Sequence, residues 1–289
     1  MHLDVERAGW MMTQKSGFAD LNGAELYYQV DGEGDALVLL HAGVADSRMW
    51  DDQVGTFAQH YKVIRYDMRG YGKSAVPSGP VSNHEDVASL LGFLHVEKAY
   101  IVGQSYGGCV AIDFALAHPE MVAALVLGAP NVGGYEFSEE VRRFGAQEDD
   151  LLDSGNFTGA TELNLRMWVD GPHRTPDQVD ASVRERVREM QFHAFNMPVP
   201  DDAEWQPLTP PAIGRLDEIR VPTLIIVGDQ DVSEFLRLAD IVAEAIAKAE
   251  QVVIPGVAHL PNMEKPAEYN RAVLDFLACL GSGSRGEVR

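Results

Sequence analysis

The sequence predicts an α/β fold with a mostly parallel central sheet, helices on both faces and an inserted helical segment. Short apolar runs of strand length alternate with longer segments that have helical spacing. One internal stretch interrupts this alternation. The chain has 289 residues, of which 46% are hydrophobic, so it is long enough to bury a large core. Strands that alternate with helices are typical of a parallel sheet covered on both sides.

The expected strands are short and apolar. The first, at 24–30, alternates in the manner of a half-exposed strand, whereas the later ones are continuous apolar runs, as buried strands are. These later runs cover residues 36–41, 62–67, 99–103, 122–128, 221–228 and 251–255.

Helices are expected between these strands. Apolar residues recur in them at helical spacing, and the segment at 83–96 opens with polar residues that can cap a helix. The expected helices cover residues 47–59, 83–96, 110–119, 235–249 and 268–280.

The stretch 131–213 breaks the pattern because it contains no convincing strand. Val179, Val183, Val187 and Met190 share one face of a helix instead. Five prolines between positions 198 and 211 close the stretch. We therefore expect an inserted helical cap between two strands of the sheet.

This insertion divides the chain into a discontinuous core, a cap and two tails. The boundaries we expect are 14–133 and 211–281 for the core, 134–210 for the helical cap, and 1–13 and 282–289 for the tails. The last tail, GSGSRGEVR, has the composition of a disordered terminus.

Charge and composition exclude several functions. A net charge of −21 argues against nucleic acid and against anionic membrane surfaces, both of which need basic patches. No stretch reaches the ~20 uninterrupted apolar residues of a membrane span, and the N-terminus makes a poor signal peptide, so a cytoplasmic location is expected. No phosphate-binding glycine motif follows a strand and no Cys/His cluster suggests a metal, so we expect no cofactor and no metal. Homo-oligomerisation is left open.

The segment AYIVGQSYGG at 99–108 places Ser105 between a buried strand and a helix. A sharp strand-to-helix turn strains the residue at its apex and crowds the positions two residues away on each side. Gly103 and Gly107 are small enough for those positions. The pattern G-x-S-x-G, in this context, predicts that Ser105 is a nucleophile.

A nucleophilic serine needs a base that an acid holds in the right tautomer. Among the histidines, His259 is best placed, in the loop between the strand at 251–255 and the last helix. His41 precedes the serine and is expected to brace its own loop by hydrogen bonding. For the acid, Asp229 and Asp231 both follow the strand at 221–228, and the residues alone leave the choice open. The remaining histidines are expected to be surface, packing or cap residues.

Four segments together resemble the α/β-hydrolase fold superfamily, in particular its carboxylesterase/lipase-like serine hydrolases with a helical cap. These segments, spread over about residues 17–280, are LLHAGVADSRMW, YDMRGYGKS, VGQSYGG, and VGDQD with VAHLPNMEKP. The order Ser, Asp, His along the chain is also that of this superfamily. In the family pattern G-x-x-D the acid matches Asp231, which implies a triad of Ser105, Asp231 and His259.

The resemblance also implies an oxyanion hole and scaffold residues. The backbone N–H groups of Tyr106 and Gly43 match its two donors. The chain departs from the usual H-G-x pattern with Ala42, which tolerates fewer backbone conformations than glycine. Asp67 and Arg69, in the YDMRGYGKS turn, are expected to be scaffold residues.

The function implied is hydrolysis of small to medium apolar carboxylic esters through an acyl-enzyme, with a small-molecule ester as the substrate. Trp168, Phe192, Phe195 and Met197 of the cap are candidates for the substrate pocket. Three alternatives keep the same triad: a C–C bond hydrolase of ring-cleavage products, a cofactor-free haloperoxidase or perhydrolase, and a ligand-binding, receptor-like module with residual hydrolysis. A dehalogenase or epoxide hydrolase of this fold would use an aspartate in place of Ser105.

Overall fold

A computed structural model describes residues 15–283, with side chains to residue 280. The expected tail at 1–13 and most of the one at 282–289 lie outside the described residues, and residues 282–283 belong to the last helix, α9 (Pro266–Gly283). No helix among the described residues is long and apolar enough to cross a membrane.

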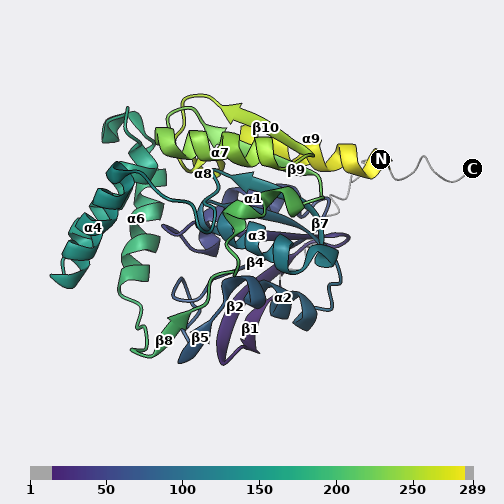
Figure 1. Cartoon of the computed structure of the whole chain (residues 1–289), viewed down its shortest axis with the longest axis horizontal. Coiled ribbons are helices and arrows are strands. Elements are labelled where there is room, and N and C mark those ends of the chain that lie inside the picture. The colour runs from purple at the N-terminus through teal and green to yellow at the C-terminus, as the bar shows by residue number, and fades with distance from the viewer. Residues whose placement is uncertain (1–14, 284–289) are drawn as a thin grey trace, which may run out of the picture.

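The centre of the molecule is an eight-stranded sheet with the order β1-β2-β4-β3-β6-β7-β9-β10 (Figure 1). The β1–β2 and β2–β4 pairs are antiparallel, and every pair from β4 to β10 is parallel. The strands are β1 (Lys15–Leu21), β2 (Ala24–Asp31), β3 (Ala36–Leu40), β4 (Lys62–Tyr66), β6 (Ala99–Gln104), β7 (Val122–Gly128), β9 (Thr223–Gly228) and β10 (Ala249–Ile254). The predicted α/β class is therefore confirmed.

Helices cover both faces of the sheet. One core cluster joins inward-facing strand residues to α2 (Asn83–Phe93), α3 (Tyr106–Ala117) and α7 (Ser233–Ala245). A second cluster joins the opposite faces of the same strands to α1 (Asp51–Phe57) and α9 (Pro266–Gly283). The strands are buried on both faces, which is why they are continuous apolar runs in the sequence.

Two strand pairings were absent from the expectations. Strand β1 precedes β2, to which a tight turn at Asn22 and Gly23 joins it, both with positive φ. Its side chains are mostly exposed because it lies at the edge of the sheet, so no apolar run marks it. A three-residue strand, β8 (Ala203–Trp205), also corrects the expectation that 131–213 contains none; it pairs with β5 (Gly79–Val81) in a separate two-stranded sheet.

Residues 134–210, which we call the cap segment, are mainly helical. Three helices and a π-helical turn make up most of it: α4 (Glu139–Asp153), α5 (Phe157–Asn164), Leu165–Asp170 and α6 (Ala181–Phe195). In Figure 1, α4 and α6 are both seen at one side of the sheet, and α5 contacts each of them. The segment leaves the core after the carboxyl end of β7, and its two ends meet there, because Ile213 N–H donates to the Gly133 carbonyl at 3.0 Å. Ligands of open α/β sheets bind at these strand ends.

Candidate active site

Ser105 occupies the turn between β6 and α3. Its backbone angles, φ 54° and ψ −112°, lie outside the regions that ordinary residues prefer. A Cβ atom at Gly103 would collide with the Gly107 carbonyl, and one at Gly107 would collide with the Leu40 carbonyl. The flanking glycines are therefore required by close backbone approach, as the sequence pattern predicts, and the turn holds the serine hydroxyl at the end of the sheet.

His259 lies beside this hydroxyl. Its Nε2 is 2.7 Å from Ser105 Oγ, and the side chain is almost fully buried. The Gln104 side-chain amide donates to the His259 carbonyl at 2.6 Å, so the residue before the serine also fixes the backbone of the histidine. The loop that carries His259 joins β10 to the short helix α8 (Pro261–Glu264).

Of the two candidate aspartates, Asp231 contacts the histidine. Its Oδ2 is 2.8 Å from His259 Nδ1, and its Oδ1 accepts a hydrogen bond from Val232 N–H. Because a carboxylate only accepts, the His259 proton sits on Nδ1 and Nε2 is left to accept from the serine hydroxyl. Asp229 instead accepts from Gly256 N–H at 2.6 Å, which braces the neighbouring turn.

Two backbone groups flank the serine at the positions expected for an oxyanion hole. Tyr106 is the first residue of α3, so its N–H has no carbonyl partner one turn earlier in the helix. Gly43 lies against it, since a Cβ built on Gly43 would be 3.5 Å from Tyr106 Cβ. Both residues line the same cavity as Ser105.

His41 holds the loop that carries Gly43. Its Nδ1 donates to the Ala42 carbonyl at 2.8 Å, and its Nε2 accepts from Met68 N–H at 2.9 Å. Burial lowers the pKa of His41, which keeps the ring in this neutral form. Ala42 is buried and its φ is not positive, so alanine fits the position that usually holds glycine in the resembled family.

Asp67 and Arg69 are buried in the scaffold below this loop, as expected. Asp67 accepts hydrogen bonds from the backbone N–H groups of Ser47 and Lys73. Arg69 pairs with Asp86 and donates to the carbonyls of the β1–β2 hairpin.

A cavity of about 660 Å³ opens onto Ser105 and His259, with walls from both the core and the cap segment. Of the four cap residues expected at a substrate pocket, Trp168 and Phe195 line this cavity. Phe192 and Met197 do not line it, contrary to the expectation, and Phe192 is 42% exposed.

Two aromatic rings pack directly on His259. The centroids of Trp168 and Phe235 lie 4.8 and 4.6 Å from that of the imidazole, and the Phe144 ring packs edge-on against Trp168. Phe144 and Phe235 were not singled out from the sequence. A usable signal existed for α4, because Val141, Phe144 and Glu148 fall on one helical face.

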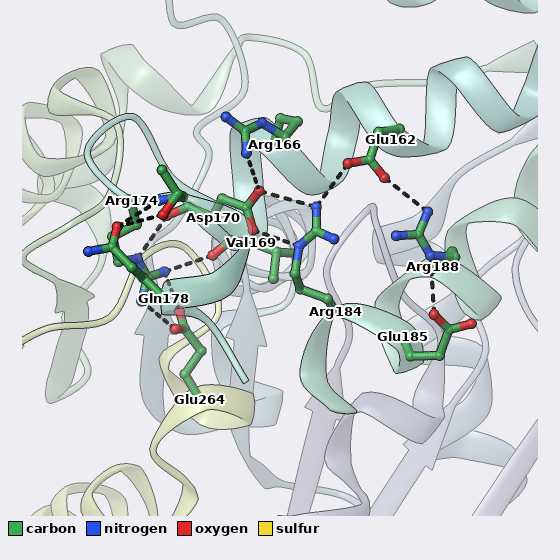
Figure 2. A network of polar contacts seen from close by, with 11 residues as sticks. Glu162, Arg166, Val169, Asp170, Arg174, Gln178, Arg184, Glu185, Arg188 and Glu264 are labelled. Atoms are coloured by element: carbon green, nitrogen blue, oxygen red, sulfur yellow. Dashed lines mark hydrogen bonds and ion pairs between the residues drawn. The ribbon is translucent and has the colours of Figure 1, made fainter. Parts of the chain in front are cut away.

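A polar network ties the cap segment to the histidine loop (Figure 2). Arg174 forms a buried ion pair with Glu264, and its guanidinium also donates to the Val169 and Asp170 carbonyls. Glu264 in turn accepts from Ala258 N–H at 2.8 Å, next to His259. The π-helical turn that carries Trp168 is thereby connected to the backbone of the histidine loop.

The described part of the chain contains no group of three or more His, Cys, Asp or Glu side chains arranged to hold a metal ion. At the cavity, the Ser105 hydroxyl and the His259 imidazole come together, with the Asp231 carboxylate behind the imidazole. Residues 37–272 match the sequence model of the alpha/beta hydrolase family. The chain belongs to the alpha/beta hydrolase family.

Relatives of this alpha/beta hydrolase are named for several hydrolytic reactions. A pimeloyl-(acyl-carrier protein) methyl ester esterase from Vibrio vulnificus is 26% identical, over 87% of this chain and 98% of that protein. A 2-hydroxy-6-oxo-6-phenylhexa-2,4-dienoate hydrolase from Comamonas testosteroni is 26% identical, over 89% of this chain and 93% of that protein. The structure of an enol-lactonase from Burkholderia xenovorans LB400 has a TM-score of 0.73 at 26% identity, over 91% of this chain and all of that one.

Proposed function

We propose that the protein is a serine hydrolase that cleaves small to medium carboxylic esters through an acyl-enzyme, with Ser105, Asp231 and His259 as its triad. The observation that carries the proposal is the continuous chain from Asp231 Oδ2 through His259 to Ser105 Oγ, with contacts of 2.8 and 2.7 Å. This arrangement is the one by which a base activates a serine hydroxyl.

In the proposed reaction, His259 Nε2 takes the hydroxyl proton as Ser105 Oγ attacks the ester carbonyl. Asp231 orients the ring and stabilises the imidazolium that forms. The N–H groups of Tyr106 and Gly43 donate to the developing oxyanion. His259 then gives its proton to the leaving alcohol, and the acyl group stays on Ser105. Water, deprotonated by His259, attacks this acyl-enzyme and releases the acid.

The shape of the cavity supports a substrate of limited size. Its volume of about 660 Å³ falls within the usual range for small-molecule sites, and aromatic side chains dominate its walls. In this proposal residues 134–210 act as a cap over Ser105 and supply much of the wall for the acyl or alcohol chain.

The Comamonas relative favours a second candidate, hydrolysis of a C–C bond in a dienoate. A dienoate carries a carboxylate, which needs a cation or a set of donors in the cavity. Arg69 is the only arginine or lysine among the described lining residues, and Asp86 and two carbonyls already hold it. Glu148, which also lines the cavity, would repel the carboxylate. We therefore prefer the ester reaction.

The test combines covalent labelling with turnover. A fluorophosphonate probe should label Ser105, and the wild type should turn over p-nitrophenyl acetate and butyrate many times. Ser105→Ala should lose both properties, with a fall in kcat of several orders of magnitude because triad members act as a unit. Ser16→Ala, at an exposed serine of β1, is the matched control and should retain both.

Undiminished esterase activity in Ser105→Ala would refute the proposal. Labelling without multiple turnover would favour a binding module instead. Preference for a dienoate over these esters would favour the C–C hydrolase, and peracid formation from acetate and hydrogen peroxide would favour a perhydrolase.

A further inference from the structure

The wall of the cavity that α4 provides changes from apolar to acidic along the helix. Val141, Phe144, Gly145 and Glu148 recur at the spacing of one helical face, and all four line the cavity. Phe144 packs on Trp168, which packs on His259. Glu148 follows Phe144 by one helical turn, about 5.4 Å farther along the axis. The carboxylate thus lies beyond an aromatic surface that starts at the imidazole.

Glu148 has no cation beside it. Among the described residues that line the cavity it is the only carboxylate, and no described lysine or arginine comes within ion-pair distance of it. Its one polar side-chain partner is the amide of Asn164, which donates at 2.5 Å. Burial raises the pKa of Glu148, as expected for a carboxylate in a largely apolar wall. A positively charged ligand would offset the free-energy cost of keeping this carboxylate ionised in an apolar wall.

Gln191 adds a second acceptor to the same cavity. Gln191 is only 4% exposed, and its Oε1 is itself buried and has no hydrogen-bond partner within the described part of the chain. A buried amide oxygen without a partner is destabilising unless a ligand donates to it. Gln191 lines the cavity, and a half-turn of its amide would exchange the buried oxygen for the NH₂ group, so it can serve as a second acceptor beside Glu148.

The rest of the cavity also favours a cation. Its aromatic side chains are the kind of surface on which alkylammonium groups bind through cation–π contacts. They are Tyr71, Tyr106, Phe137, Phe144, Trp168, Phe195, Trp205 and Phe235. The net charge of −21 would in addition attract a cation toward the protein from solution.

We propose that Glu148, with Gln191, binds an alkylammonium group at the end of the substrate farthest from the scissile ester. The ammonium has three donors, enough for both acceptors, and its positive charge would pair with the carboxylate. The proposal rests on the ester hydrolysis proposed above and specifies its substrate class. The aromatic wall of the cavity contacts the methylene chain of the acyl group. Glu148 and Gln191 then favour an ester whose acyl chain ends in an ammonium group over one whose chain ends in a methyl group.

The test compares esters that differ only at this end. p-Nitrophenyl 6-aminohexanoate is paired with p-nitrophenyl heptanoate, in which a methyl group replaces the ammonium. A second pair, the p-nitrophenyl esters of 8-aminooctanoate and nonanoate, has a longer chain between the ester and the ammonium. The measured quantity is the kcat/KM of the amino ester divided by that of its alkyl partner. Glu148→Gln, which keeps the size of the side chain, should lower this ratio by about tenfold or more for at least one pair.

Two further variants complete the experiment. Asp150→Asn removes the same charge from an exposed position on α4 and should leave the ratio within about twofold, because exposed charges act only weakly at a distance. Gln191→Leu removes the second acceptor and should also lower the ratio; it carries the test if Glu148→Gln does not fold. The proposal would be overturned if Glu148→Gln lowered the ratio by less than about fivefold for both pairs of esters, or if Asp150→Asn lowered it by as much as Glu148→Gln does.

A binding measurement separates this proposal from the proposed function. Trp168 and Trp205 line the cavity, so tryptophan fluorescence can follow titration with hexylammonium chloride and, separately, with 1-hexanol. Hexylammonium should bind more tightly, and Glu148→Gln should abolish the difference. If the wild type hydrolyses none of the esters, the ester function fails, yet this binding result would still support the ammonium site. Equal binding of the two ligands to the wild type would overturn it.

Discussion

Two aspartates in one turn face different partners, although they are only two residues apart. Asp231 contacts His259, whereas Asp229 is exposed and holds Gly256 N–H. We predict that Asp231→Asn lowers kcat for p-nitrophenyl butyrate by about 10⁴-fold, because the amide favours the wrong tautomer of the imidazole. Asp229→Asn makes the same chemical change and should reduce kcat by less than about tenfold while lowering Tm. The reverse order in two folded variants would contradict the assignment of Asp231.

Asp113 of α3 makes stability depend on pH. It is 8% exposed, its Oδ1 has no hydrogen-bond partner among the described residues, and burial raises its pKa to about 6 against the opposing effect of Arg215. A carboxyl whose folded pKa exceeds its unfolded pKa stabilises the protein fully at low pH. This stability is lost as the pH rises from about 4 to about 6.

Asp113→Asn removes this titration. We predict that the variant gains free energy of unfolding over the wild type, and that the gain is about 1–2 kcal/mol larger at pH 7.5 than at pH 4.5. Urea unfolding at the two pH values measures the difference. A gain that is the same at both pH values would show that Asp113 does not titrate in this range.

At the scale of elements, α6 provides a matched pair of phenylalanines. Phe195 lines the cavity and Phe192 is exposed outside it. Phe195→Ala should shift the ratio of kcat/KM between butyrate and octanoate p-nitrophenyl esters by an amount equivalent to about 1–3 kcal/mol, because it removes contacts to the acyl chain. Phe192→Ala should leave that ratio unchanged. Equal effects, or none in Phe195→Ala, would mean that other residues set the chain-length preference.

The connection between the cap segment and the histidine loop depends on one buried ion pair. The side chains of Arg174 and Glu264 are 9% and 7% exposed, and Glu264→Gln would leave the arginine buried without its counter-charge. We predict a loss of about 3 kcal/mol in the free energy of unfolding. Glu139→Gln, which breaks the exposed pair with Arg142 on α4, should lose at most about 0.5 kcal/mol. Similar losses in both variants, measured by urea unfolding, would contradict this role for Arg174 and Glu264.

At the scale of the whole molecule, the features that the sequence made predictable are those with a local cause. Buried parallel strands must be continuous apolar runs, and the turn at Ser105 needs glycines on both sides, so both are visible in short windows of sequence. The choice between Asp229 and Asp231 had no local cause; it depended on a family pattern, and the structure shows Asp231 against His259.

The features that the sequence did not reveal depend on tertiary packing. An exposed edge strand such as β1 has no apolar run, and the exposure of Phe192 depends on tertiary packing around α6, which a short window of sequence does not show. The sequence alone does not distinguish Glu148 from the other acidic residues of α4. Only the packing of α4 against Trp168 places it in the cavity wall.

The central claim is that Ser105 carries the acyl group during turnover, and rapid quenching tests it most directly. Wild-type protein is mixed with excess p-nitrophenyl butyrate and quenched in acid within milliseconds to seconds, and the peptide that contains Ser105 is analysed by mass spectrometry. We predict a butyryl adduct on Ser105, with a burst of p-nitrophenol that approaches one per chain if deacylation limits turnover. Steady release of p-nitrophenol with no adduct on Ser105 at any time, together with unchanged turnover in Ser105→Ala, would contradict the account.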